Sequence, residues 1–147
     1  MKKLQSSALA AVTAVSALTV LAVAPAAADD APNLVGTWKG ETQAVHIGPN
    51  PYRIPETNGA NFPDNFIEFT YVVTQQEGTR FAGHTEGKFT EDFIGMLKPP
   101  EYRSGIFIDD DGQYDFTLRD DKTIDMCYWH QYSTSKVVAC WTLTRQP

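Results

Sequence analysis

The sequence has few of the features that mark catalytic or metal-binding proteins. It holds two cysteines, Cys127 and Cys140, and their spacing lacks the tight C-x-x-C form of many thiolate metal sites. No G-x-S-x-G nucleophile motif occurs, and helical periodicity is confined to the first 28 residues. We therefore predict no catalytic residue, no metal ion and no cofactor.

The longest apolar run lies near the start of the chain and is typical of a secretory leader. Lys2 and Lys3 precede an apolar run from Leu9 to Val23, and a small-residue cleavage motif, 26–28, follows it. This run is too short and too rich in alanine for a good membrane span, and no second one follows. We predict a signal peptide over residues 1–28, cleaved near Ala28, and a mature domain over residues 29–147 in the periplasm or outside the cell.

The formal net charge of the chain is -6, and removal of the two leader lysines makes the mature domain more acidic. Nucleic acid and anionic lipid both repel such a surface, so we expect no nucleic-acid partner and no membrane span. The composition leaves the oligomeric state undefined. An oxidising compartment favours pairing of the two cysteines.

Beyond the leader the sequence is typical of strands and turns. Runs rich in aromatic and β-branched residues alternate with turn residues. They predict about eight strands, near residues 34–47, 66–75, 80–89, 91–98, 102–108, 113–119, 123–131 and 136–144. The proline-rich segment between Gly48 and Asn65 predicts a long loop, which in a compact domain is usually functional or disordered. The short turns elsewhere predict one all-β, antiparallel, up-and-down barrel.

The last two predicted strands define their own register. If the turn centres between Ser133 and Thr134, Cys127 lies directly opposite Cys140, close enough for a cross-strand disulfide. The same register collects a largely apolar set on the other face, which we expect to face the interior. This set comprises Ile124, Met126, Tyr128, His130, Val137, Ala139, Trp141 and Leu143.

Gly36-Thr37-Trp38, at the start of the first predicted strand, resembles the G-x-W signature of lipocalins and the G-T-W that opens avidin-like barrels. The resemblance implies a lipocalin- or avidin-like barrel whose Trp38 packs at the closed end beneath a basic residue. Arg145 is placed to cover it, since a guanidinium can lie on an indole face while its head stays hydrated. The resemblance also implies binding of small apolar ligands.

The aromatic residues on the strands permit two interpretations. They either fill the core or line a pocket, since an eight-stranded barrel can be packed or can hold one small ligand. For the second interpretation we predict that Tyr52 and Phe62 contact the ligand from the long loop as a lid. The predicted ligand-binding residues are Trp38, Tyr52, Phe62, Phe69, Tyr71, Tyr128, His130 and Trp141.

Several polar residues have two interpretations. His84 and Glu86 share one strand face and could bind a metal, although a solvent face explains them better. His130 is expected to be partly buried, and His46 to lie at the barrel mouth. Glu68 is expected to be an exposed partner of a basic residue. The run from Asp109 to Gly112 predicts a hairpin turn with a left-handed glycine.

The leading functional hypothesis is an exported, non-catalytic barrel that binds a small apolar or aromatic ligand. The first alternative is a periplasmic protein-binding module, such as a protease inhibitor, with a filled interior. The second alternative is a small enzyme that uses a cavity histidine. It requires His46, His84 or His130 to lie inside, next to a carboxylate or a tyrosine.

Overall fold

Residues 31–147, which the computed structural model describes, form strands and turns without a helix. The predicted signal peptide over residues 1–28 and its cleavage site lie outside these residues and stay predictions. Among the described residues, none belongs to a helix of the length and apolarity needed to cross a membrane.

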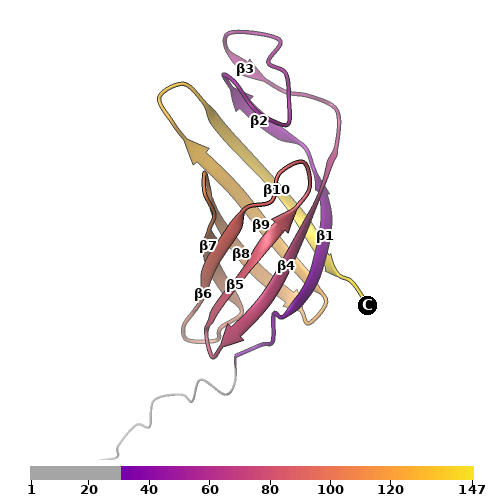
Figure 1. The fold of residues 1–147 in the computed structure, drawn as a ribbon, viewed down its shortest axis with the longest axis vertical. Coiled ribbons are helices and arrows are strands. Elements are labelled where there is room, and N and C mark those ends of the chain that lie inside the picture. The colour runs from indigo at the N-terminus through magenta and orange to yellow at the C-terminus, as the bar shows by residue number, and fades with distance from the viewer. Residues whose placement is uncertain (1–30) are drawn as a thin grey trace, which may run out of the picture.

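Ten strands follow one another along the described chain (Figure 1). They are β1 (Gly36–Thr42), β2 (Ala44–Ile47), β3 (Ala60–Asn61), β4 (Ile67–Glu77), β5 (Arg80–Glu86), β6 (Asp92–Lys98), β7 (Ser104–Ile108), β8 (Gln113–Asp120), β9 (Thr123–Gln131) and β10 (Lys136–Arg145). The first predicted strand is divided at Gln43 into β1 and β2. The predicted loop carries the short strand β3.

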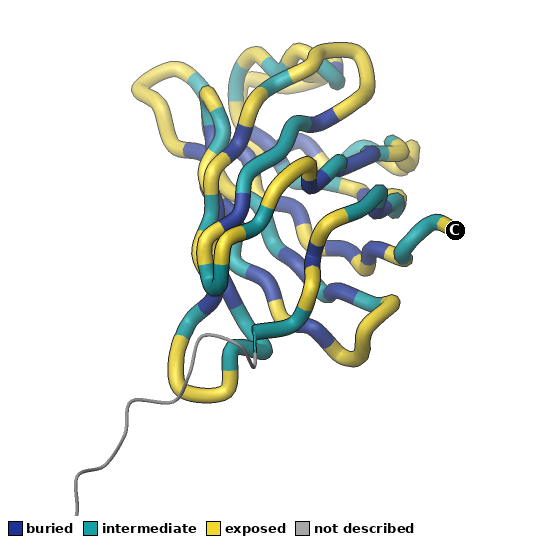
Figure 2. The backbone as a smooth tube through the Cα atoms, turned by 60° about the horizontal axis from the view of Figure 1, so that its bottom comes forward, coloured by how far each residue is buried: buried dark blue, intermediate teal, exposed yellow. Residues whose placement is uncertain are grey.

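Eight of these strands close into an antiparallel barrel, which confirms the predicted fold class. Strands β4 to β10 pair in sequence order, and β1 pairs with β4 on one side and with β10 on the other. Trp38 lies opposite Arg145 at this last seam, which leaves the barrel no free edge there. Side chains therefore alternate between a lumen and the outer surface, as the alternating colours of Figure 2 show.

Strands β2 and β3 extend the sheet beyond one end of the barrel, at the top of Figure 1. Strand β2 pairs with the start of β10, and β3 pairs with β2. The turns between β5 and β6, β7 and β8, and β9 and β10 lie at this same end. We call this end the mouth, and the opposite end, where the described chain begins, the closed end.

The β9–β10 hairpin has the register that the sequence predicts. Cys127 lies opposite Cys140, and the two form a disulfide on the outer face. Met126 lies opposite Trp141, and both are buried. One register thus satisfies both the disulfide and the burial pattern.

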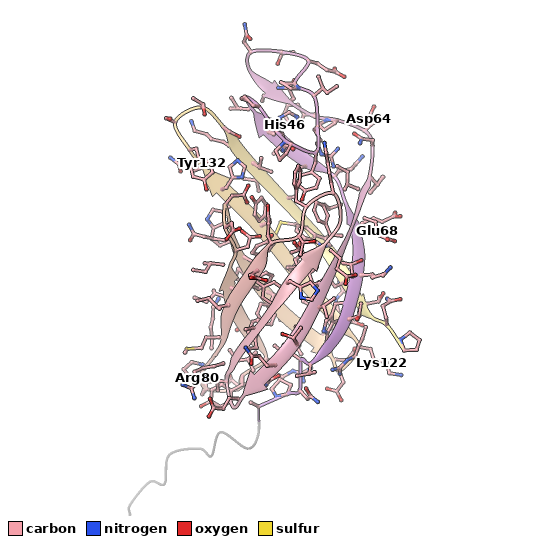
Figure 3. All side chains as sticks on the ribbon, viewed as in Figure 1. His46, Asp64, Glu68, Arg80, Lys122 and Tyr132 are labelled. Atoms are coloured by element: carbon pink, nitrogen blue, oxygen red, sulfur yellow. A yellow bond between two sulfur atoms is a disulfide. The ribbon has the colours of Figure 1, made fainter. Side chains whose placement is uncertain are left out.

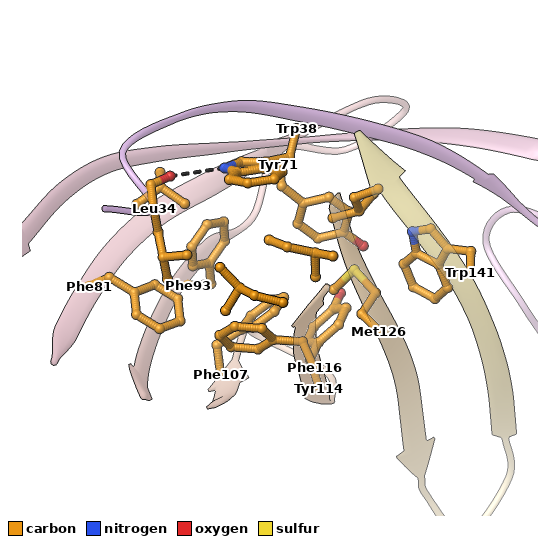
Figure 4. Packing of buried hydrophobic residues seen from close by; sticks show 14 of the residues in the cluster. Leu34, Trp38, Tyr71, Phe81, Phe93, Phe107, Tyr114, Phe116, Met126 and Trp141 are labelled. Carbon is orange, nitrogen blue, oxygen red and sulfur yellow. Dashed lines mark hydrogen bonds between the residues drawn. The ribbon is translucent and has the colours of Figure 1, made fainter. Parts of the chain in front are cut away.

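The closed end is sealed by Trp38 and Leu34. Trp38 is 1% exposed, and its indole nitrogen donates a hydrogen bond to the Leu34 carbonyl oxygen over 2.9 Å (Figure 4). The Arg145 guanidinium lies over the outer face of the indole, 5.0 Å from the ring centroid. It also donates to the carbonyl oxygens of Asn33 and Val35, so it ties the last strand to the segment that precedes the first.

Aromatic rings fill the lower half of the lumen. Phe81, Phe93, Phe107 and Phe116 are buried there with neighbouring centroids 5.0 to 6.4 Å apart. Glycine makes room for them: a Cβ at Gly95 would lie 2.3 Å from the Phe81 ring. This half of the barrel is an aromatic core that retains a cavity of about 30 Å³, half the volume of the one at the mouth. The filled-core interpretation therefore fits the closed end better than the mouth.

Candidate functional site

A cavity of about 60 Å³ lies at the mouth, above the packed core. One water needs about 10–15 Å³ of such space, so the cavity has room for about four to six waters or for one small ligand. Its wall combines residues of β1, β2, β4, β5, β8, β9 and β10 with residues of the loops at the mouth. The rings that line it are those of Tyr52, Phe69, Tyr71, Tyr114, Tyr128, His130 and Trp141.

Tyr52 covers one side of the cavity from the long loop. Its ring makes edge contacts with Phe69, at 5.2 Å between centroids, and with Phe89, at 5.6 Å. Burial raises the pKa of Tyr52 to about 12, and the carboxylates of Glu91, Asp111 and Asp109 add to this rise. Tyr52 is therefore a neutral phenol that places an apolar ring face over the cavity.

The loop is anchored by Arg53, which is buried. Its guanidinium donates to the Thr42 carbonyl oxygen over 3.1 Å, and to the carbonyl and side-chain oxygens of Asn65, each over 2.8 Å. Burial lowers the pKa of Arg53. Three amide oxygens rather than a carboxylate thus surround this cation, and no acidic side chain of residues 31–147 forms an ion pair with it.

Three carboxylates gather at the mouth. Glu91 ends the β5–β6 loop, Asp109 and Asp111 belong to the β7–β8 turn, and one oxygen from each lies within 4.8 Å of the others. Asp109 accepts hydrogen bonds from the Gly112 amide and the Tyr114 hydroxyl, so it holds the turn together. We call Glu91, Asp109 and Asp111 the acidic corner.

Glu91 differs from the other two carboxylates. Within the described chain its side-chain oxygens accept no hydrogen bond, whereas its backbone is fixed by two hydrogen bonds with Thr85. Partial burial raises its pKa to about 7, and the charges of Asp111, Asp109 and Asp110 contribute to this rise. Within residues 31–147 the ionised form of Glu91 thus has neither a hydrogen-bond donor nor an ion-pair partner, and the neighbouring charges disfavour it.

A chain of hydrogen bonds leads from the acidic corner to the long loop. The Tyr128 hydroxyl lies 2.8 Å from an Asp111 oxygen and 2.8 Å from Nδ1 of His130, while Nε2 of His130 lies 3.0 Å from the Ser135 hydroxyl. Ser135 in turn donates to the Pro49 carbonyl oxygen over 2.8 Å. This chain fixes the Tyr128 and His130 rings in the cavity wall.

Protons in this chain can be counted. Ionised Asp111 and the Pro49 carbonyl only accept, so four hydrogen bonds require four protons. Tyr128, Ser135 and neutral His130 supply three. With neutral His130, three of these four hydrogen bonds can therefore form at one time.

The indole nitrogen of Trp141 is the unusual atom of the cavity wall. Trp141 is 9% exposed and lines the cavity, and its Nε1 has no hydrogen-bond partner within residues 31–147. Almost all buried polar groups in proteins have a partner, and an unsatisfied donor costs about 1–3 kcal/mol. The nitrogen itself has almost no accessible surface, so it is buried within the wall and does not face the cavity.

Six of the eight predicted ligand-binding residues line this cavity: Tyr52, Phe69, Tyr71, Tyr128, His130 and Trp141. The other two lie elsewhere. Trp38 is at the closed end, beneath Arg145. Phe62 is 76% exposed because it follows Asn61, which points inward from β3, and successive side chains of an extended segment alternate in direction. Phe62 therefore does not line this cavity, in contrast to Tyr52 of the same loop.

The structure places the other polar residues of the sequence analysis in different environments. His84 and Glu86 lie on the outer face, 3.6 Å apart, and exposed Glu68 pairs with Lys39 at 3.7 Å. His46 is at the mouth end (Figure 3) but is fully buried, with Nε2 unpartnered among the described residues, and does not line the cavity. Gly112 closes the predicted turn without a left-handed backbone. A glycine is needed there because a Cβ would meet the Tyr128 ring at 1.9 Å.

Sequence reasoning missed Arg53 and the acidic corner. The sequence predicts a turn at the aspartates, which is correct for Asp109. It predicts a strand that begins at Glu91, whereas β6 begins at Asp92. Their joint position depends on which turns meet at the mouth, a property of the closed barrel rather than of any local pattern. No protein-family model and no curated protein matches the chain.

Proposed function

We propose that this protein is an exported, non-catalytic barrel that binds one small, mainly apolar ligand in the mouth cavity. The observation that carries the proposal is the cavity of about 60 Å³ at the mouth, whose wall is mainly aromatic and apolar with a few polar side chains. Ligand sites combine apolar walls with a few well-placed polar groups, and this cavity has that composition.

The division of the lumen supports a binding role. The closed end is packed with rings, while the mouth retains a cavity under a loop held by Tyr52 and Arg53. The apolar part of such a ligand would contact Phe69 and Tyr71 in the cavity wall.

The test is native mass spectrometry of the protein purified from the periplasm without denaturant. We expect extra mass that disappears on denaturation and that is reduced in Trp141→Phe, which removes part of the aromatic wall of the cavity. Trp129→Phe is the matched control, since Trp129 is exposed on the outer surface. A bare polypeptide mass, together with no binding of small aromatic probes, would overturn the proposal.

A second function is favoured by the contact of Ser135 with His130. His130 lies in the cavity wall beside Tyr128 and Asp111, which meets the requirement for a cavity enzyme. Ser135 would then be an acyl-transfer nucleophile with His130 as its base. This function ranks second because the Ser135 hydroxyl donates to Pro49. Hydrolysis of p-nitrophenyl acetate that disappears in Ser135→Ala would support it, and equal rates for both proteins would exclude it.

A further inference from the structure

We propose that this protein forms a dimer with a second copy of itself through the outer face of β6 and β7. Four exposed side chains make up the centre of this face, and we call them the apolar patch: Ile94, Met96, Ile106 and Ile108. The inference is independent of the proposed function, since none of the four lines the mouth cavity. It is carried by the exposure of the patch, by its arrangement and by the charges at its two sides.

The apolar patch is one continuous surface on the left of Figure 1. Ile94 lies opposite Ile108, and Met96 lies opposite Ile106, as neighbouring pairs across β6 and β7. All four side chains point outward, because the residues that alternate with them point into the barrel. They are 48% to 64% exposed, so no other part of residues 31–147 covers them.

Surface apolar residues that lie singly are normal, whereas contiguous ones mark interaction sites. This patch has defined limits on the barrel. Two further exposed apolar residues, Trp129 and Val138, are separated from it by β8, whose outward side chains at this height are Gln113 and Asp115. The patch is therefore a local feature of one side of the barrel with polar surroundings, as the centre of an interface is.

Opposite charges lie at the two sides of the patch, in one row across the strands. Arg80 of β5 is the backbone partner of Met96, and Asp115 of β8 is the backbone partner of Ile106. The positive charge thus lies one strand beyond β6, and the negative charge lies one strand beyond β7. Both side chains reach solvent, with 64% of Arg80 and 47% of Asp115 exposed.

This row is complementary to itself. A two-fold axis that runs along the strands, between β6 and β7, places β6 of one copy against β7 of the other. Met96 then faces the partner's Ile106, Arg80 faces the partner's Asp115, and the isoleucines of the next row face one another. A two-fold interface makes each contact twice, so the row gives an apolar centre with one ion pair on each side.

The ion pairs within one copy are compatible with this contact. Arg80 pairs with Glu77 over 2.8 Å, and Lys98 pairs with Asp115. In the dimer, Arg80 lies between Glu77 and the partner's Asp115, and that aspartate lies between two cations. Networks of this kind contribute more than isolated surface pairs. A second copy therefore matches the patch in charge as well as in its apolar centre.

The first experiment is sedimentation velocity of the purified protein at about 1–200 µM, where we expect a dimer with a dissociation constant of roughly 1–100 µM for a small interface. The double variant Met96→Thr, Ile106→Thr should raise this constant about tenfold or more. Threonine favours strands, so the barrel should still fold. The control is Val138→Thr, which changes an equally exposed residue of β10 and should leave the constant unchanged.

The second experiment reverses the charges one at a time, in Arg80→Asp and Asp115→Arg. Either variant alone places like charges opposite each other in its own dimer and should associate about tenfold more weakly. In an equimolar mixture the two variants form a mixed dimer in which unlike charges face each other again. Native mass spectrometry distinguishes the mixed dimer by its mass, and we expect it to exceed both dimers of a single variant.

Three results would overturn the proposal. A monomer at the highest concentration would exclude the second copy and leave the patch to another protein. A dimer that the double threonine variant leaves intact would lie on a different surface. A mixture of the charge variants that associates no better than either alone would show that Arg80 does not face the partner's Asp115. None of these results depends on a ligand in the mouth cavity.

Discussion

At the scale of single residues, Glu91 is where the fold maintains an unfavourable charge. Its pKa is raised from 4.5 to about 7, so the folded protein releases this proton less readily than the unfolded chain. A raised carboxyl pKa contributes stability that is fully present below about pH 4.5, declines between pH 4.5 and 7, and is absent above pH 7. Glu91 therefore makes the protein less stable at neutral and alkaline pH.

We predict that Glu91→Gln is more stable than the unaltered protein at pH 8 and equally stable near pH 4. The amide removes the charge that burial and the neighbouring aspartates disfavour. Urea denaturation at both pH values measures the difference. Glu86→Gln, on the outer face, is the control, and a loss of stability at pH 8 in Glu91→Gln would contradict the interpretation.

Arg145 is a second single residue with a clear effect on stability. It covers the Trp38 indole and donates hydrogen bonds to the carbonyl oxygens of Asn33 and Val35. Arg145→Ala should cost about 1–3 kcal/mol of unfolding free energy and shift tryptophan emission to the red. Arg80→Ala, which removes an exposed pair with Glu77, should cost less than about 1 kcal/mol. Both unfolding free energies are measured by denaturant titration. Equal losses of unfolding free energy in the two variants would show that the cover over the indole contributes nothing to stability.

At the scale of elements, the β9–β10 hairpin shows what sequence can predict. Three signals lie within about twenty residues of sequence: a short turn, two cysteines and alternating apolar residues. All three predict the same register, and the structure has it. The long loop shows the opposite. Its two-residue strand β3 pairs with β2 and turns Phe62 outward, and no local pattern signals that pairing. The acidic corner was missed for a related reason, since Glu91 and Asp111 meet only once the barrel closes.

The disulfide belongs to this scale because it joins neighbouring strands on their outer face. The double variant Cys127→Ser, Cys140→Ser should unfold at lower urea concentration, with a loss of about 2–3 kcal/mol for a loop of this length. Ligand affinity should stay the same, since neither sulfur lines the mouth cavity. A changed affinity for small aromatic probes would show that the disulfide also shapes the mouth.

At the scale of the whole molecule, the barrel is packed at one end and hollow at the other. This division explains how the same aromatic residues satisfy both interpretations of the sequence: those near Trp38 fill the core, and those near Trp141 line a cavity. Tyr71 lies between the mouth cavity and the core of the closed end and lines both. Its burial raises the pKa of its hydroxyl group.

Export is also a prediction about the whole molecule. The denatured mass of protein recovered from the periplasm should correspond to residues 29–147 with two hydrogens lost at the disulfide. Treatment with a reductant should add those two hydrogens back. A mass that includes residues 1–28 would show that the leader is retained.

The contacts between rings have a spectroscopic consequence. Phe107 and Tyr114 stack at 4.0 Å with an interplanar angle of 8°, and Tyr71 lies 6.3 Å from Trp141 by centroids. Chromophores held so close in one asymmetric arrangement give strong near-ultraviolet circular dichroism, which disappears when side-chain packing is lost even if the strands persist. The protein thus contains an intrinsic optical probe that spans both ends of the lumen, and its signal reports tertiary order without any label.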